Sequence, residues 1–201
     1  MSDGSETGRS DGLEIERKWL LTRLPDRIEA FERGEADAVD DVIQRVRLRQ
    51  GYLRPATDAE LESFAADGDV AGPIRFGRLR SIESASGVRH VLTVKSGAGL
   101  VRREVERPIE ASTFEAAWPA TEGRRLEKTR WRVAEPDGFV WEIDRFERLD
   151  LLLAEVEVAD EAAAEAVTVP DWLAPVIDRE VTHEPRFTNA EIALRAGYGR
   201  S

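Results

Sequence analysis

Acidic and basic residues alternate in several short segments of the chain, beginning with Glu14, Glu16 and Lys18. Residues two apart in an extended strand point to the same face, so each segment would gather its charges on one side. The carboxylates that follow this pattern are Glu14, Glu16, Glu104, Glu106, Glu142, Asp144, Glu155 and Glu157. The bases are Lys18, Arg78, Arg80, Lys95, Arg102, Lys128, Arg130 and Arg132.

These residue types are suited to binding hard cations and polyanions. The chain has no Cys and only two His, so clustered carboxylates favour Mg²⁺ or Mn²⁺ over softer metals. Clustered Arg and Lys favour a polyanion. A metal ion and a polyanion bound together indicate a phosphate chain whose oxygens the metal bridges. A P-loop and a G-x-S-x-G motif are both missing, and a glycosidase would not need so many bases around its carboxylates.

Lysine is rare in this chain and is confined to the pattern. Of 29 Lys and Arg residues only Lys18, Lys95 and Lys128 are lysine, and all three fall among the alternating bases. A lysine is a compact charge that can approach a single phosphate oxygen, whereas the guanidinium of arginine is a rigid, permanently charged fork. The usage indicates that the two bases are not interchangeable at these positions.

The elements that must position these charges are mostly strands. Alternation and β-branched or aromatic content predict eight of them, at 12–21, 42–53, 74–82, 88–96, 101–109, 125–134, 139–146 and 151–158. Short helices are expected within 22–38, 56–73, 112–119 and 160–167. A C-terminal helix is expected from Thr188 or Asn189 to a stop at Gly197. This order favours a mainly β protein, α+β by count, with an antiparallel sheet that is closed or nearly closed.

A closed sheet would turn the charged faces into a polar lumen, where each charge must be paired, bind metal or bind a charged ligand. The alternative for any one strand is an ordinary solvated face of a half-buried sheet. A further alternative for the whole set is a structural barrel held by salt bridges.

Length and composition set the outer limits. The 201 residues favour a single domain over 12–201, with a disordered tail at 1–11 and an insertion at about 54–73. A net charge of −11 disfavours nucleic acid and anionic membranes as partners. No signal peptide and no membrane-length apolar run occur, so a cytoplasmic location is expected.

Several motifs together resemble the CYTH superfamily, also called triphosphate tunnel metalloenzymes. The first, EIERK at 14–18, matches a Glu-x-Glu-x-Lys signature. The others are RQGYL at 49–53, GRLR at 77–80, LTVKSG at 92–97, GLVRREVE at 99–106, TEGRRLEKTRW at 121–131, WEID at 141–144, AEVEV at 154–158 and PRFTNAEIAL at 185–194. The chain is most similar to short bacterial members that hydrolyse inorganic triphosphate.

The resemblance implies an eight-stranded antiparallel closed barrel with a hydrophilic tunnel, a few peripheral helices and a C-terminal helix. It implies that Glu14, Glu16 and Glu157 bind the main divalent metal with Glu155 close by, and that Glu104, Glu106 and Asp144 hold a second metal or orient the attacking water. It implies phosphate clamps at Lys18, Arg78, Arg80, Lys95, Arg102, Lys128, Arg130 and Arg186. Tyr52 matches a tyrosine that pairs with the first-strand lysine, here Lys18, during catalysis.

The sequence departs from the family pattern near its C-terminal motif. Pro185 replaces a basic residue and Phe187 replaces a tyrosine, which weakens the assignment of Arg186. Arg132 and Glu142 are interpreted as a structural pair. The alternating residues Arg45, Arg47 and Arg49 are interpreted as surface charges.

The resulting hypothesis is a Mg²⁺- or Mn²⁺-dependent hydrolase that converts inorganic triphosphate to pyrophosphate and phosphate, with a homodimer as one option for its assembly. Alternatives with the same fold are an adenylate cyclase and a thiamine or nucleoside triphosphatase, both of which need a pocket for an organic group. An alternative of another class is a non-catalytic polyphosphate-binding module, which need not keep the metal carboxylates.

Overall fold

The computed structural model describes residues 15–35, 43–66, 73–96, 103–158 and 160–198. The predicted tail at 1–11 and part of the predicted insertion lie outside these ranges. The strands are β1 Ile15–Leu21, β2 Ile43–Tyr52, β3 Arg78–Ser84, β4 Gly87–Ser96, β5 Arg103–Ile109, β6 Arg125–Ala134, β7 Val140–Phe146, β8 Leu152–Val158 and β9 Ile177–Glu180. The helices are α1 Asp26–Glu32, α2 Asp58–Ala66, α3 Ala111–Ala117, α4 Glu161–Ala166 and α5 Asn189–Tyr198, with 3₁₀ turns η2 Trp118–Thr121, η3 Ala174–Val176 and η4 Pro185–Phe187.

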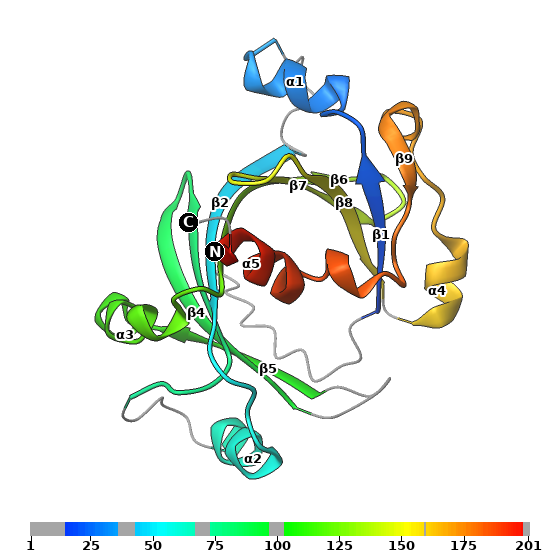
Figure 1. Ribbon diagram of the computed structural model, residues 1–201. Coiled ribbons are helices and arrows are strands. Elements are labelled where there is room, and N and C mark those ends of the chain that lie inside the picture. The colour runs from blue at the N-terminus through cyan, green and yellow to red at the C-terminus, as the bar shows by residue number, and fades with distance from the viewer. Residues whose placement is uncertain (1–14, 36–42, 67–72, 97–102, 159, 199–201) are drawn as a thin grey trace, which may run out of the picture.

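The nine strands form one sheet in the order β5-β4-β3-β2-β6-β7-β8-β1-β9, and each adjacent pair is antiparallel. The mainly antiparallel architecture and the positions of the first eight strands agree with the prediction. The sheet curves around α5, while α1, α2, α3 and α4 lie outside it (Figure 1).

The predicted closed barrel of eight strands is wrong for the described residues, because the sheet is open and has a ninth strand. Closing the first eight strands would require β1 to pair with β5. The second edge of β1 instead pairs with β9 at Trp19, Leu20 and Leu21. The sequence of β9 is only four residues long, IDRE, too short to show an alternating pattern. The sequence of β9 therefore does not indicate which strand it pairs with.

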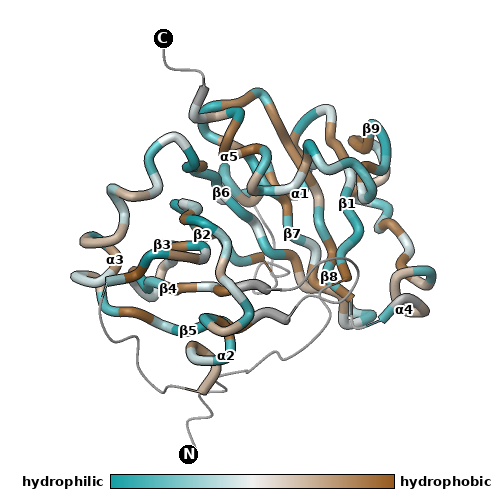
Figure 2. Tube along the Cα trace, turned by 60° about the horizontal axis from the view of Figure 1, so that its bottom comes forward, coloured by the Kyte–Doolittle hydropathy of each residue, from teal (hydrophilic) through white to brown (hydrophobic). Residues whose placement is uncertain are grey.

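Apolar residues on the outer face of the sheet pack against the helices. On β7, Trp141 and Ile143 are fully buried in a cluster that also contains Ile28 of α1. On β4, Leu92 packs in a second cluster with Phe114 of α3. This alternation fixes the register, because a slip of one residue would turn these side chains into the charged interior and the charges outward. Figure 2 shows teal and brown alternating along the strands.

Helix α5 covers one end of the curved sheet (Figures 1 and 2). Its N-terminus is capped as predicted, since the hydroxyl of Thr188 accepts a hydrogen bond from the backbone N–H of Glu191 at 3.4 Å. The predicted stop at Gly197 is wrong, because the helix continues to Tyr198. A Cβ on Gly197 would lie 2.2 Å from the carbonyl oxygen of Gly123. Glycine is present there because the helix packs closely against that turn.

None of the helices in the described ranges has the length and apolar character required to cross a membrane.

Candidate active site on the concave face of the sheet

The concave face of the sheet encloses a cavity of about 450 Å³. Its lining comes from strands at both sides of the curved sheet and from the first residue of α5. The sequence-predicted site residues that line it are Glu16, Arg78, Arg80, Glu106, Lys128, Arg130, Glu155 and Glu157. The sheet therefore brings together residues more than 140 positions apart in the sequence, from both predicted classes.

The charged part of the interior ends at an apolar layer beneath α5. Along β6 the inward residues run from Arg130 through Lys128 to Leu126, and Leu126 packs in one cluster with Phe146 and with Ile192 of α5. This layer excludes water from one end of the cavity. Charges next to it interact in a medium of lower effective dielectric constant than bulk water.

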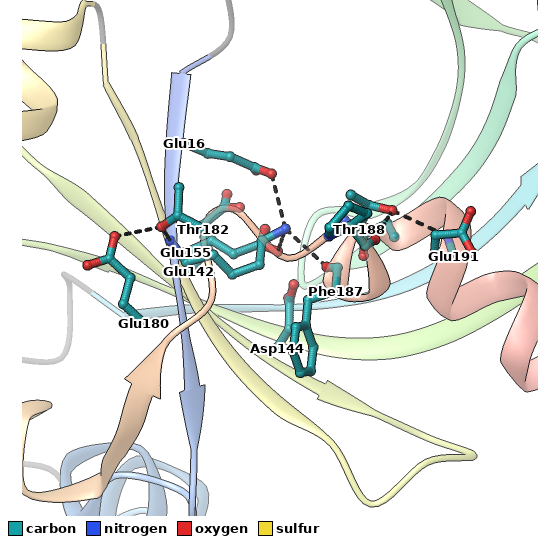
Figure 3. Close-up of polar contacts among 12 residues, drawn as sticks. Glu16, Glu142, Asp144, Glu155, Glu180, Thr182, Phe187, Thr188 and Glu191 are labelled. Carbon is teal, nitrogen blue, oxygen red and sulfur yellow. Dashed lines mark hydrogen bonds and ion pairs between the residues drawn. The ribbon is translucent and has the colours of Figure 1, made fainter.

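Lys18 forms ion pairs with two of the predicted metal ligands, Glu16 and Glu155, both of which are labelled in Figure 3. Its ammonium nitrogen is 3.0 Å from Glu16 Oε1 and 3.0 Å from Glu155 Oε1, and it donates a hydrogen bond to the carbonyl oxygen of Phe187 at 3.3 Å. The side chain is only 5% exposed. Burial by itself would lower the pKa of Lys18, but the two carboxylates outweigh it and raise the pKa above the usual lysine value. Lys18 is therefore held as a cation.

A second buried network joins β6 to β7. Asp144, which is fully buried, accepts hydrogen bonds from Lys128 Nζ at 2.5 Å and from Arg130 Nε and Nη2 at 2.6 Å each. Arg130 also pairs with Glu142 and, at 3.0 Å, with Glu155. Burial favours a raised pKa for Asp144, but Arg130 and Lys128 hold the pKa below its usual range. Both oxygens of the Asp144 carboxylate are thus occupied by Lys128 and Arg130.

The strand register places carboxylates directly opposite one another. Glu16 faces Glu157 across β1 and β8, and Glu142 faces Glu155 across β7 and β8. Like charges in directly opposite positions destabilise a sheet unless a cation offsets them. Glu155 Oε1 is also buried and accepts no hydrogen bond, although it is in an ion pair with Lys18.

All these donors are carboxylate oxygens, which suits a hard divalent cation. No group of three or more His, Cys, Asp or Glu in the described ranges is already arranged around a metal position. Glu14, the further predicted ligand, lies outside those ranges. The residues present therefore fit a magnesium-type ion in donor chemistry.

The wall formed by β2 and β3 carries arginines with a different kind of partner. Arg80 Nε donates to Gln50 Oε1 at 3.3 Å, and Arg80 Nη1 lies 3.7 Å from Glu106. Burial and the neighbouring Arg78 lower the pKa of Arg80 to about 10. The hydroxyl of Tyr52 accepts a hydrogen bond from Gln50, whereas Lys18 is hydrogen-bonded to Glu16 and Phe187. Within the described residues the predicted contact between Tyr52 and Lys18 is thus replaced by one to Gln50.

Other predicted site residues do not line the cavity, or they lie outside the residues that the structure describes. Arg186 lies on η4 with 62% of its side chain exposed, pairs with Glu184 at 2.7 Å and is absent from the cavity lining in the described structure. Its role as a phosphate clamp stays a prediction. Glu14 and Arg102 fall outside the described residues, as do the side chains of Lys95 and Glu104. The predicted pair of Arg132 and Glu142 is confirmed at 3.2 Å.

Sequence reasoning missed the polar lining residues Gln44, Gln50, Ser84, Arg89 and Asn189, and the apolar ones Val46, Leu48 and Ile82. Gln50 and Arg89 have the inward phase of their strands, so the alternation used for the charges could have found them. Asn189 carries no such signal. It approaches Lys128 Nζ at 3.0 Å only because α5 packs against the end of the sheet.

Comparison with known proteins gives closely related sequences and folds. No family model matches the chain. A protein named inorganic triphosphatase from Nitrosomonas europaea is 40% identical over 184 residues, which are 90% of this chain and 97% of that protein. A crystal structure of an inorganic triphosphatase matches with a TM-score of 0.52 and 36% identity, covering 90% of this chain and 94% of the other. A Pyrococcus horikoshii protein matches with the same TM-score at 17% identity, covering 90% and 98%, and this shows a shared fold alone.

Proposed function

This chain belongs to the CYTH superfamily, among the inorganic triphosphatases, and on that premise we propose that it hydrolyses inorganic triphosphate to pyrophosphate and phosphate in the cavity on its concave face. The observation that carries the proposal is the position of Lys18. It is a buried cation held 3.0 Å from two carboxylates of the predicted metal set. Both carboxylates line the same cavity as the arginines of β3, whereas Lys18 itself is not among the lining residues of the described structure.

A divalent ion, Mg²⁺ or Mn²⁺, would be held by Glu16, Glu155 and Glu157, with Glu14 as a further ligand. When bound, such an ion polarises phosphoryl oxygens and neutralises part of the negative charge of the substrate. Asp144 has both oxygens engaged by Lys128 and Arg130, so we assign it the role of fixing those bases.

The residues of the chain act on the remaining charge. Attack by water forms a bond to a terminal phosphorus and breaks its bond to the bridging oxygen, so negative charge develops on the departing pyrophosphate. Arg78 and Arg80 offset the charge of the phosphate chain from the β3 wall. Lys18, whose raised pKa keeps it protonated, stabilises the leaving oxygen as a fixed cation. Glu106, which lines the cavity and is not one of the proposed metal ligands, orients the water and accepts its proton.

The test is phosphate release from inorganic triphosphate by the wild type, measured with Mg²⁺, with Mn²⁺ and with neither ion. We expect metal-dependent release that is abolished in Lys18→Ala and in Glu16→Ala without unfolding. Arg45→Ala is the control, since Arg45 lies on the outer face and pairs with Glu32 at 3.2 Å. Wild-type turnover in Lys18→Ala would overturn the mechanism. Binding of triphosphate without phosphate release would support the polyphosphate-binding module.

A second candidate function is hydrolysis of an organic triphosphate. One part of the cavity wall is apolar, because Val46, Leu48 and Ile82 face inward and pack with Val91. This patch supplies the surface for an organic group that the sequence did not reveal. ATP and thiamine triphosphate in the same assay, together with measurement of cyclic AMP, separate this activity and the cyclase from the inorganic triphosphatase. The cytoplasmic location and the homodimer stay predictions.

A further inference from the structure

Gln50 occupies a buried position in the cavity wall that the charge pattern did not reveal. Its side chain lies on β2, the residue is 1% exposed, and it lines the cavity. Both ends of its amide are used. Oε1 accepts from Arg80 Nε at 3.3 Å, and Nε2 donates to the hydroxyl oxygen of Tyr52. A fully buried glutamine with two engaged ends has a fixed orientation.

The chemistry of the partners determines which way the amide faces. The guanidinium of Arg80 can only donate hydrogen bonds, so the carbonyl oxygen of Gln50 must face it. The amide nitrogen then faces Tyr52, whose oxygen accepts. Tyr52 is thereby the anchor at the far end of the amide. The three side chains form one directed chain from Tyr52 through Gln50 to Arg80.

A neutral acceptor has a consequence that a carboxylate would not have. On the other wall, Arg130 is paired with Asp144, Glu142 and Glu155, so its charge is offset inside the protein. The acceptor at Arg80 Nε is an uncharged amide. The ion-pair partner of Arg80 is Glu106, which lies 3.7 Å from Arg80 Nη1 and has 42% of its side chain exposed. The amide orients the guanidinium and leaves most of its positive charge available to an anion in the cavity.

We propose that Gln50 is a positioning residue that aims the guanidinium of Arg80 at the phosphate chain without neutralising it, with Tyr52 holding the amide in place. This inference rests on the proposed function, because it takes the phosphate chain as the anion in the cavity. It assigns to the β2 wall a role in substrate affinity rather than in bond cleavage.

The experiment measures KM and kcat for inorganic triphosphate in Gln50→Leu, Gln50→Glu, Arg80→Ala and the double variant Gln50→Leu/Arg80→Ala. Losing a hydrogen bond to a charged group should raise KM about tenfold in Gln50→Leu. We expect kcat to change little. In the Arg80→Ala background, Gln50→Leu should have no further effect on KM, because the residue through which it acts is gone.

Gln50→Glu separates this role from simple packing. A glutamate keeps an acceptor for Arg80 and can accept from Tyr52, so a purely structural role predicts recovery of the wild-type KM. The proposal predicts a KM at least as high as in Gln50→Leu, since the carboxylate neutralises Arg80. This second variant keeps the test decisive if Gln50→Leu fails to fold.

Three results would overturn the inference: a wild-type KM in either Gln50 variant, or additive effects of Gln50→Leu and Arg80→Ala. A wild type that neither binds nor hydrolyses triphosphate would instead overturn the proposed function, so the two failures are distinguishable.

Discussion

Replacing Asp144 by asparagine should destabilise the fold and strengthen the binding of an anion in the cavity. The substitution keeps the shape of the side chain but removes a negative charge that is fully buried. Lys128 and Arg130 are then left with less counter-charge in a buried setting. The two expected effects have opposite signs, so a general loss of structure cannot produce both.

The magnitude follows from the contacts. Asp144 accepts three hydrogen bonds of 2.5–2.6 Å from two buried cations. Removing one partner of a buried ion pair costs about 3–5 kcal/mol. The lower end applies here, because the amide oxygen still accepts one bond and Glu142 and Glu155 still pair with Arg130. A loss of about 3 kcal/mol in the free energy of unfolding lowers Tm by about 6–12 °C in a protein of this size.

The assay is thermal unfolding with and without inorganic triphosphate, in the absence of metal. We expect triphosphate to raise the Tm of Asp144→Asn by more than it raises the Tm of the wild type. Asp178→Asn is the matched control, since Asp178 is 49% exposed and lies 3.8 Å from Arg179. A stability within about 0.5 kcal/mol of the wild type, the range of an ordinary surface change, would refute the reasoning. A smaller triphosphate shift in Asp144→Asn would refute it too.

Three further outcomes can be checked. If Arg186 is the predicted phosphate clamp, Arg186→Ala should raise KM for triphosphate severalfold; a kcat/KM within about twofold of the wild type would remove this residue, whose side chain is 62% exposed, from the phosphate ligands. Gly197→Ala should lower the free energy of unfolding in urea by about 1–3 kcal/mol, since its Cβ would collide with the carbonyl of Gly123; a neutral effect would contradict the close packing of α5. The raised pKa of Lys18 means that its stabilising charge is lost only as pH rises through that pKa. The stability difference between wild type and Lys18→Met should therefore stay constant from neutral pH to about 10, and a difference that shrinks below that pH would contradict the raised pKa.

The strands and their two faces could be predicted because alternation is a local property of the sequence. β6 begins at Arg125 and ends at Ala134, as expected from the pattern. The same phase placed Lys128 and Arg130 inward and Trp131 outward. The three outward arginines of β2, Arg45, Arg47 and Arg49, are exposed, as interpreted.

What could not be predicted depends on contacts between distant segments. The sheet stays open because β9 pairs with β1. A strand of four residues is too short for its sequence pattern to indicate this pairing. Gln50 has a neutral side chain, so a search for alternating charges passed over it. Gly197 was interpreted as a helix stop. A residue without a Cβ is required there because α5 packs against the backbone at Gly123, a contact that the local sequence does not indicate.

The sequence predicts which side chains share a face, because the two-residue period of a strand is a local property. It therefore determined that carboxylates, lysines and arginines would meet on one surface, and which ligand chemistry they suit. Which charges neutralise one another depends on the folded arrangement of the strands. Arg130 and Arg80 have the same phase and the same residue type. Arg130 nevertheless pairs with three carboxylates, whereas Arg80 pairs with an amide and with one carboxylate at 3.7 Å. That difference arises from strand order and register, which bring residues together across the curved sheet, and no local pattern contains it.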